Sequence, residues 1–479
     1  MNEAKDAPSG WVPATIHEVA ETVFGQSPPS SSYNKHRKGL PFFQGKAEFG
    51  AKYPVARTWC TEPTREAQAG DILISVRAPV GPTNVADRHC AIGRGLAAIR
   101  PFIEPDYVRF WLQRSERVLA AKGTGTTFSA ISKGVLNSHA IPVAPLNEQR
   151  RIVEKVETLF ARLDKGEEAL LEVQKLLARY RQSVLKAAVT GELTADWRAE
   201  NAHRLEHGRD LLARILQTRR ETWDGRGKYK EPVAPDTTDL PELPEGWVWA
   251  SIDQLLVRLT SGSRAWKKYY GRGDGTFIMA QNVRPMRFDL TQRFAVDPPP
   301  DSPDAIRSEV QREDILITIV GANTGDVCRF PLDEREYYVC QSVALLRLVD
   351  VELSPFVEMY LSGKGAGRDQ IETFIYGAGR PHLGFEELRA IKVPLPPKVE
   401  RAEIVARINE EFERLAQVEA ICQTELARSA ALRQSILKDA FSGRLVPQDP
   451  ADEPAAALLE RIKEARAAAP RKPRRKACA

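Results

Sequence analysis

The side chains best suited to chemistry form a basic and aromatic cluster in the second half of the chain. Six cations are interrupted only by Asp274 and are interleaved with Trp266, Tyr269 and Tyr270. These cations are Arg264, Lys267, Lys268, Arg272, Arg284 and Arg287. Lysine commonly holds phosphate, whereas Arg, Gln and Asn can read base edges through paired hydrogen bonds. The cluster therefore predicts a surface that binds nucleic acid.

Candidate contacts can be named in both halves of the chain. In the first half they are Lys35, Arg37, Lys38, Gln44, Lys46 and Lys52, with Thr124, Thr126 and Thr127 in a glycine-rich loop. In the second half they are Arg264, Lys267, Lys268, Tyr269, Tyr270, Gln281, Asn282 and Arg284, with Arg380 and His382 in the matching loop. For any single residue a solvated charged face is the alternative, so the prediction rests on the clusters.

A catalytic constellation is not found. The sequence contains no G-x-x-x-x-G-K-[ST] phosphate loop, and the glycine-rich segments 123–127 and 377–381 do not lead from a strand into a helix. Asp297-Pro-Pro-Pro300 lacks the aromatic residue of the similar methyltransferase motif, and the six cysteines include no C-x-x-C pair. We therefore expect a non-enzymatic chain that binds no metal.

The elements that must position these residues occur twice. Arg181-Gln-Ser-Val-Leu-Lys-Ala-Ala-Val-Thr-Gly-Glu-Leu193 aligns without a gap with Arg433-Gln-Ser-Ile-Leu-Lys-Asp-Ala-Phe-Ser-Gly-Arg-Leu445, and Gly10-Trp-Val12 is echoed by Gly246-Trp-Val248. Short apolar runs predict strands at 40–43, 71–75 and 96–99, and again at 277–279, 314–318 and 343–346. Helices are predicted at 101–121 and 355–361. The chain thus consists of two copies of one unit.

Two long helices follow the globular parts, the first with Asn147 as its expected N-cap. Their apolar residues recur at steps of three and four, which predicts a paired coiled coil with a flaw at Gly166. The expected core is Ile152, Val156, Leu159, Leu163, Leu170, Leu177 and Val184, with Ile404, Ile408, Phe412, Leu415, Leu432 and Ile436. Gly191 and Gly443 are placed to end the helices. Each helix would be roughly 63 Å long, so the pair could hold two DNA-reading domains about one turn of DNA apart or somewhat more.

The predicted fold class is α+β: two mixed α/β globular domains separated by two long antiparallel helices, with an internal pseudo-two-fold duplication. The expected segments are 10–146 (first domain), 147–192 (first helix), 193–245 (connection with a short helix), 246–397 (second domain), 398–443 (second helix) and 444–479 (short helix and basic tail). The first domain has 16 basic against 10 acidic side chains, and the second has 18 against 20. Without an apolar run long enough to span a membrane, or a signal peptide, we expect a cytoplasmic protein.

These segments together resemble the specificity subunit of type I restriction-modification systems. The resemblance is carried by Pro145-Leu-Asn-Glu-Gln149, Leu185-Lys-Ala-Ala-Val-Thr-Gly-Glu-Leu193, Trp197-Arg198 and Leu243-Pro-Glu-Gly-Trp-Val248. Leu40-Pro-Phe-Phe-Gln-Gly-Lys46 and Gly123-Thr-Gly-Thr-Thr127 are similar to recurrent segments of the family's target recognition domains. The resemblance covers nearly the whole chain, although Pro397-Lys-Val-Glu400 replaces the Glu-Gln start in the second copy.

The resemblance implies a division of labour. Each target recognition domain would read one half of a bipartite, asymmetric site in double-stranded DNA, and the helices would dock two modification subunits. Those subunits would bring S-adenosylmethionine, and restriction subunits would bring ATP and Mg for translocation and cleavage. This chain would bind no cofactor itself.

Two other classes of function remain open from the residues. One is a coiled-coil scaffold that binds only protein, against which the basic aromatic cluster argues. The other is an enzyme with an unrecognised active site, such as a nuclease, for which metal-dependent cleavage by the isolated chain would be needed.

Overall fold

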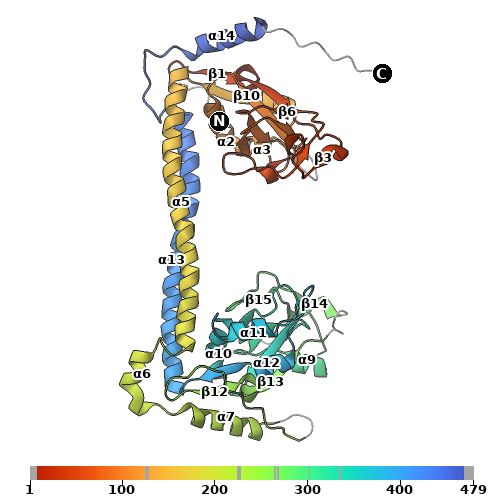
Figure 1. Cartoon of the computed structure of the whole chain (residues 1–479), viewed down its shortest axis with the longest axis vertical. Helices are drawn as coiled ribbons and strands as arrows, with labels where there is room; N and C mark the ends of the chain where they lie inside the picture. Colours follow the sequence, from red (N-terminus) through yellow and green to blue (C-terminus); the bar gives the residue numbers. More distant parts are fainter. Residues whose placement is uncertain are drawn as a thin grey trace. The chain divides into compact units, whose positions relative to one another are not determined.

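The computed structural model describes residues 8–124, 129–223, 228–263, 266, 269–299, 301–333 and 336–468. The chain divides into two compact units (Figure 1). Unit 1 comprises Met1–Leu171 and Gln423–Ala479, and unit 2 comprises Glu172–Cys422. We call the globular part of unit 1 head 1 (residues 8–145) and that of unit 2 head 2 (residues 246–397).

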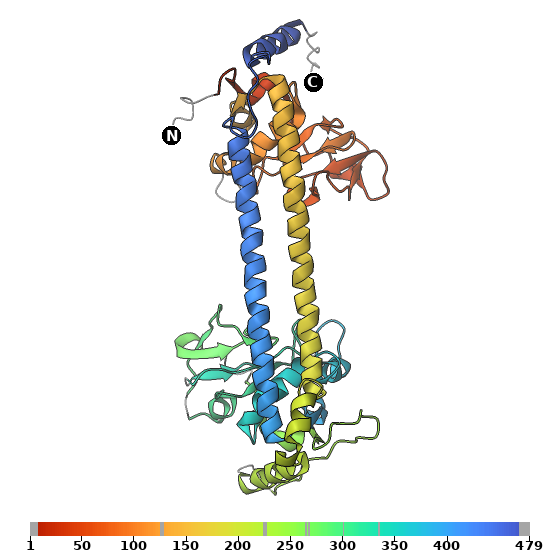
Figure 2. The same ribbon diagram turned by 90° about the vertical axis from the view of Figure 1, so that its left-hand side faces the viewer.

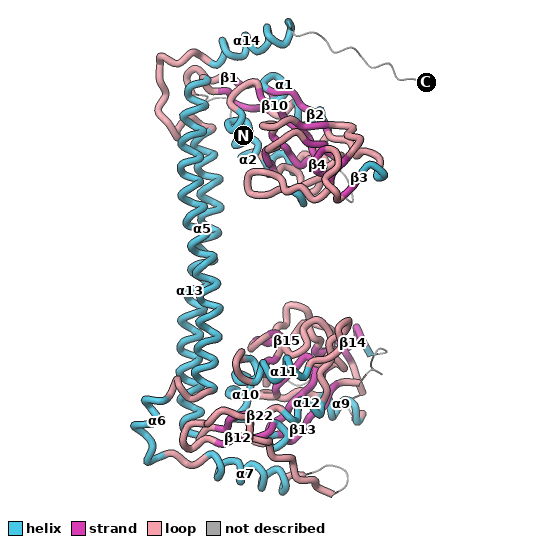
Figure 3. Tube along the Cα trace, in the orientation of Figure 1, coloured by secondary structure: helices cyan, strands magenta, loops and turns pink. Residues whose placement is uncertain are grey.

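Head 1 is a mixed α/β globule in which strands from distant parts of the chain pair (Figure 3). β1 (Val12–Thr15) pairs antiparallel with β11 (Ala140–Val143), so the two ends of the head meet. One sheet has the order β2-β10-β7-β8, formed by Ala20–Phe24, Leu96–Pro101, Ile72–Ser75 and Thr83–Val85. The other has the order β3-β5-β4-β9-β6, formed by Tyr33–Asn34, Trp59–Cys60, Leu40–Phe43, Cys90–Ile92 and Glu66–Ala67. Its helices are α1 (Ile16–Val19), α2 (Pro105–Arg114), α3 (Glu116–Ala121) and α4 (Lys133–Asn137), with 3-10 turns at Ser30–Ser32 and Lys46–Glu48.

Head 2 repeats this arrangement with different lengths. β12 (Val248–Ser251) pairs with β22 (Lys392–Leu395) and closes the head. The sheet β13-β21-β18-β19 is formed by Leu256–Ser261, Val343–Leu348, Ile315–Thr318 and Val327–Arg329. The sheet β17-β14-β20 is formed by Ala295–Val296, Tyr270–Ile278 and Tyr337–Val339, and β15 (Val283–Arg284) pairs with β16 (Arg287–Phe288). The helices are α8 (Ile252–Leu255), α9 (Pro303–Ser308), α10 (Ser354–Ser362), α11 (Gly367–Phe374) and α12 (Phe385–Ala390), with a 3-10 turn at Val351–Leu353.

The predicted strands lie where the structure has β4, β7, β10, β14, β18 and β21, and the helix expected at 355–361 is α10. In each head one pair is parallel, β4 with β9 and β14 with β20. The prediction of one helix over 101–121 was wrong. Residue 101 still belongs to β10, and a new helix begins at Pro105, whose fixed φ suits a first helical position; Ser115 then separates α2 from α3.

A buried ion pair accounts for the repeated Asp-Ile-Leu-Ile sequence at the start of β7 and β18. Asp71 accepts hydrogen bonds of 2.9 and 2.7 Å from Arg100, and Asp314 accepts bonds of 2.8 and 2.6 Å from Arg347. Each carboxylate also accepts a backbone N–H three residues earlier, at 2.7 Å. Both aspartates are 2% exposed, and a buried charge is tolerated when it is paired and fully hydrogen-bonded. The repeated aspartates therefore stabilise the fold of each head.

The long helices are α5 (Leu146–Val189) and α13 (Lys398–Ala440), and segments of both lie side by side within each unit (Figures 1 and 2). In unit 1 Ile152, Val156 and Ile436 join the core of head 1; in unit 2 Val184, Ile404 and Ile408 join that of head 2. Gly191 and Gly443 have positive φ just after the helix ends, as predicted. None of the helices in the described part of the chain is long and apolar enough to cross a membrane.

Three details of the helix prediction were wrong. Asn147 is not the N-cap, because α5 already begins at Leu146. Gly166 is exposed, and Glu167 instead turns toward α13, where it accepts a 2.6 Å hydrogen bond from Ser429. Leu432 is 46% exposed and lies outside the core, since the neighbouring Arg433 faces α5 and bonds Asp164 at 2.5 Å. Polar pairs therefore replace the apolar seam over this stretch.

Each head is attached to the helix that leaves it by a tryptophan–glutamate hydrogen bond. In joint 1 the indole Nε1 of Trp11 donates to Glu148 at 3.0 Å; in joint 2 that of Trp247 donates to Glu400 at 2.8 Å. The glutamates are 1% and 0% exposed, and each stands in the first turn of its helix. Carboxylates are favoured there by the helix dipole. The repeated Gly-Trp-Val segment and the repeated start of the long helix thus meet in the same hydrogen bond in both units.

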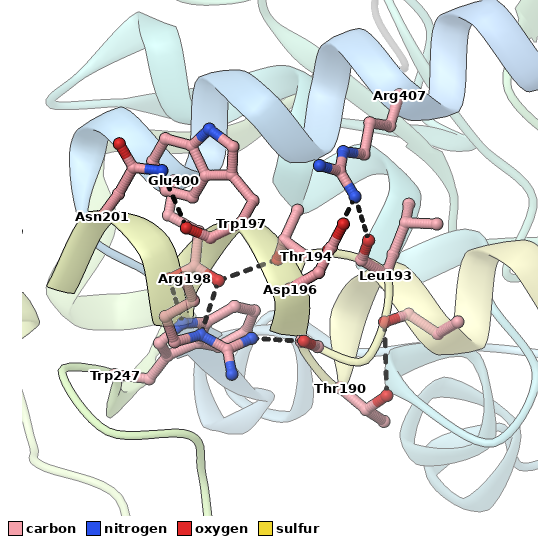
Figure 4. Close-up of polar contacts among 12 residues, drawn as sticks. Thr190, Leu193, Thr194, Asp196, Trp197, Arg198, Asn201, Trp247, Glu400 and Arg407 are labelled. Atoms are coloured by element: carbon pink, nitrogen blue, oxygen red, sulfur yellow. Dashed lines mark hydrogen bonds and ion pairs between the residues drawn. The ribbon is translucent and has the colours of Figure 1, made fainter.

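Joint 2 contains an additional clamp (Figure 4). Thr194 and Arg198 each donate a 2.8 Å hydrogen bond to Glu400 Oε1, and Arg198 also bonds the carbonyl of Gly191. Arg198 belongs to α6 (Ala195–Asn201), which follows the end of α5. Joint 1 has no equivalent arginine among the described residues, because Pro450 stands at the position aligned with Arg198. Burial raises the pKa of Glu148 there.

A short helix closes each head from outside. In unit 2, α7 (Gly208–Glu221) packs on head 2, and the N–H of Gly208 donates to Gly246 at 2.7 Å. In unit 1, α14 (Ala455–Ala468) packs on head 1, and the N–H of Ala455 donates to Gly10 at 3.1 Å. Arg214 pairs with Glu206 and Arg461 pairs with Glu453 in the same register. The duplication therefore includes these closing segments.

We expect the two joints to respond unequally to loss of charge. Glu400→Gln leaves the guanidinium of Arg198, whose side chain is 16% exposed, without its carboxylate, which should cost about 2–4 kcal/mol of unit 2 stability. Glu148→Gln should cost less, because no arginine bonds Glu148 in the described residues and burial already disfavours its charge. Amide hydrogen exchange in β12 and β22 against β1 and β11 would measure both effects. Equal losses in the two units would contradict the asymmetry.

We also expect head 1 to lose stability in mild acid through His139. This residue is 5% exposed and stacks on Trp111, and burial lowers its pKa to about 4. Because the unfolded chain takes up a proton near pH 6.5 and the folded chain does not, stability falls as the pH drops from 6.5 to 4, by roughly 2–3 kcal/mol.

His139→Ile should remove this pH dependence from head 1. Ile391 occupies the equivalent place in head 2, since the carbonyls of residues 139 and 391 accept the N–H of Ile16 and Ile252 respectively. Thermal unfolding between pH 4 and 7.5 would compare the variant with the parent. An unchanged slope in the variant would contradict this role of His139.

Candidate nucleic-acid interface

The candidate residues of head 1 lie mainly on two loops beside β4. Lys35, Arg37 and Lys38 are exposed on the turn that joins β3 to β4. Gln44 and Lys46 are exposed directly after β4, where the chain turns into the 3-10 helix Lys46–Glu48. Polar side chains therefore flank β4 at both of its ends.

Lys52 was also a candidate, and its surroundings make it a poor one. Its Nζ lies 3.9 Å from Asp106 and 3.6 Å from Glu157, so two carboxylates already balance its charge. Together with Lys46 it lines a cavity of about 830 Å³ in unit 1 whose other wall is the acidic face of α5. That wall carries Glu157, Asp164, Glu167 and Glu168. The charge of Lys52 is therefore already balanced within the fold.

The glycine-rich loops occupy equivalent places in the two heads. Thr124 is bridged to Ala130, and the next residue, Ile131, bonds the chain just after β7. In head 2 Tyr376 is bridged to His382, and Leu383 bonds the chain just after β18. Thr126 and Thr127 lie outside the described residues. The predicted match between the loops is thus confirmed for their bases.

The loop of head 2 carries an aromatic residue that the sequence reasoning missed. Tyr376 is 57% exposed and stacks on His382, with ring centroids 6.0 Å apart and an interplanar angle of 21°. Arg380 is exposed at the tip, and the described residues include no ion-pair partner for it. Its position directly before Gly377, at the start of the glycine-rich loop, could have identified Tyr376 from the sequence. Arg380, His382 and Tyr376 together form the polar tip of head 2.

The members of the basic aromatic cluster of head 2 have different environments in the structure. Arg264, Lys267 and Lys268 lie outside the described residues. Trp266 is 2% exposed and stacks on Phe277 at 5.7 Å, so it belongs to the core and not to a binding surface. Tyr269 also packs against this core, whereas Tyr270 is 44% exposed at the start of β14. The aromatic spacing in the sequence reflected packing for two of the three residues.

Asn282 was predicted to contact DNA, and the structure gives it another role. It is 1% exposed; its amide nitrogen donates to the carbonyls of Asp289 and Gln292, and its oxygen accepts the N–H of Met279. A side chain whose donors are used inside the fold cannot read a base. Gln281 is half-buried and bonds Gln292 at 3.3 Å, and Arg284 is half-buried on β15. These two remain candidates.

We also searched the described residues for side chains that could bind a metal ion or act as nucleophiles. Within the described ranges, no group of three His, Cys, Asp or Glu side chains could hold a metal ion. The five cysteines there are buried thiols, and burial raises the pKa of Cys90 to about 12. Burial also raises the pKa of Cys328 and Cys340, so these three thiols stay protonated at neutral pH.

Comparison with known proteins finds similarity to specificity subunits of type I restriction enzymes. Residues 8–173 match the family model of the type I restriction modification DNA specificity domain. The chain is 34% identical over 201 residues to a putative type I restriction enzyme MjaX specificity subunit of Methanocaldococcus jannaschii, a match that covers 40% of this chain and 45% of that protein. It is 27% identical over 498 residues to the type I restriction enzyme StySPI specificity subunit of Salmonella potsdam, covering 98% and 97% of the two chains.

A solved structure has the same fold. It is a chain from a study of complex assembly and conformational transition in a type I restriction-modification system, with a TM-score of 0.64 and 19% identity. The match covers 91% of this chain and 99% of that one. At this level of identity the likeness concerns the arrangement of the backbone.

Proposed function

We propose that this chain is a specificity subunit of a type I restriction-modification system, in which head 1 and head 2 each read one half of a bipartite, asymmetric DNA site. The chain is a specificity subunit and not a catalytic one. The observation that carries the proposal is that the two heads share topology and attachment but differ in the polar residues they expose. Two different reading surfaces on one chain fit a site with two unlike halves.

The charges of the heads fit this proposal. Head 1 carries the larger basic excess and exposes Lys35, Arg37, Lys38 and Lys46 around β4. Phosphate contacts of this kind supply affinity that does not depend on sequence. Head 2 has no net basic excess, and its contacts are proposed at the polar tip formed by Tyr376, Arg380 and His382, with Tyr270, Gln281 and Arg284.

The long helices are proposed to dock two modification subunits. On α5 the side chains of Leu176 and Tyr180 are 51% and 50% exposed, and on α13 that of Ile421 is 61% exposed. Exposed apolar side chains on a helix are a usual feature of protein interfaces. Lys175 and Arg179 lie beside them on α5, where both pair with Glu172. In this proposal S-adenosylmethionine, ATP and Mg are bound by modification and restriction subunits, and the complex acts in the cytoplasm.

Mapping of methylated adenines in the host genome, with and without this gene, would test the DNA-reading proposal. We expect a bipartite motif that is methylated only when the gene is present. Replacing head 2 by that of a relative should change one half of the motif and leave the other half as it was. A methylome that does not depend on the gene would exclude the proposal.

Co-purification with the modification subunit would test the docking proposal. The combined variant Lys175→Glu, Leu176→Asp and Arg179→Glu should weaken assembly at least ten-fold, because it reverses charge and removes apolar area on one helix surface. Arg312→Glu is the control for reversal of charge elsewhere in unit 2, since the side chain of Arg312 is 55% exposed in head 2. Unchanged recovery of the modification subunit with the triple variant would count against docking at this surface.

A further inference from the structure

The turn between β3 and β4 in head 1 is held in a fixed conformation. The side-chain oxygen of Asn34 accepts the N–H groups of His36 and Lys38 at 3.1 and 3.0 Å, and its nitrogen donates to the carbonyl of Lys38 at 2.9 Å. Gly39 follows with φ of +82°, and a Cβ at this position would lie 2.1 Å from the carbonyl oxygen of Cys60. The backbone that presents residues 35–38 is therefore preorganised.

Arg37 is the unusual residue of this turn. Its φ is +59°, a left-handed conformation that non-glycine residues seldom adopt and that is found preferentially at functional sites. Its guanidinium carbon lies 5.8 Å from the ring centroid of Trp59, which is within the range of a cation–π contact. Among the described residues no carboxylate lies within ion-pair distance of Arg37. Its hydrogen-bond donors have no partner among the described residues.

A second arginine, Arg88, lies beside Arg37 but already has a carboxylate partner. Arg37 and Arg88 both line a cavity of about 300 Å³, whose remaining walls are Phe43, Pro54, Ala56, Trp59 and Asp87. Arg88 donates from Nε and Nη2 to Asp87 at 2.9 and 2.6 Å, so the edge of its guanidinium is occupied. Among the described residues, the Nε–Nη2 edge is therefore free in Arg37 and occupied in Arg88.

We propose that Arg37 is a specificity-determining residue that reads a guanine in the half-site of head 1. The inference rests on the proposed function. An arginine edge matches O6 and N7 of guanine in the major groove, which is the commonest specific contact between proteins and DNA. Lys35 and Lys38, on either side of it in the same turn, hold phosphates. A phosphate contact alone would not require a strained backbone or a stacked guanidinium, because a flexible cation serves equally well.

The turn allows a variant that separates the guanidinium from the backbone. Glycine adopts positive φ at no steric cost, so Arg37→Gly relieves the strain at this position while Asn34 still holds the turn. Arg37→Lys keeps the charge and removes the planar pair of donors. Lys35→Ala and Lys38→Ala are the matched controls for loss of charge from the same turn.

Selection of bound sequences from a randomised duplex pool, with the full chain in complex with its modification subunit, would test the inference. We expect Arg37→Gly and Arg37→Lys to lose preference for guanine at one position of the head 1 half-site by about ten-fold to a hundred-fold, with other positions unchanged. Lys35→Ala and Lys38→Ala should instead weaken binding to all sequences and reduce the salt dependence by about one phosphate each.

Two results would overturn the inference. One is an Arg37→Gly variant that keeps the full guanine preference of the parent. The other is an Arg37→Lys variant that binds like the parent while Arg37→Gly weakens binding to all sequences alike, which would make Arg37 a phosphate contact. If the parent complex selects no bipartite sequence at all, the proposed function itself fails, and this result is distinct from both.

Discussion

The structure depends on a hydrogen bond between the indole at the start of each head and the carboxylate at the start of the helix that leaves it. A buried carboxylate is costly unless its oxygens are hydrogen-bonded, so Glu148 and Glu400 strongly favour the geometry in which Trp11 and Trp247 reach them. The pairing of β1 with β11 and of β12 with β22 brings the two ends of each head to this point. Surface loops between these ends can vary without changing this contact.

That arrangement separates the residues that maintain the fold from those that can change with the target. The Asp71–Arg100 and Asp314–Arg347 pairs lie inside the heads and are the same in both. The turns beside β4 and the loop before His382 lie on the surface, and the amino-acid sequence at each place differs between the two heads. Substitutions on these loops therefore need not disturb the buried pairs or the joints. A protein whose task is to recognise changing sequences benefits from this independence.

Much of the architecture could be predicted from the residues, because it depends on local patterns. Apolar runs located six strands, glycines located the helix ends, and the aligned repeats indicated two copies. Exposure could not be predicted in the same way. Trp266 and Asn282 have residue types suited to DNA contact, yet the first fills the core of head 2 and the second satisfies backbone carbonyls. Which side of the chain faces solvent is decided by tertiary packing. The contacts of Arg198 with Glu400 and of Arg37 with Trp59 likewise depend on partners that lie elsewhere in the sequence.

The two units differ in the order in which their closing helices and their heads are synthesised. Unit 2 is one continuous stretch of chain, with α7 made before the head that it covers. Unit 1 needs α14, which is made about 300 residues after head 1 and covers the region of Ile16 and Val19 through Leu458 and Ile462. Head 1 therefore emerges from the ribosome with this apolar patch uncovered, and it stays so while all of unit 2 is translated. A nascent chain that stalls late would carry a finished second head and an unfinished first one.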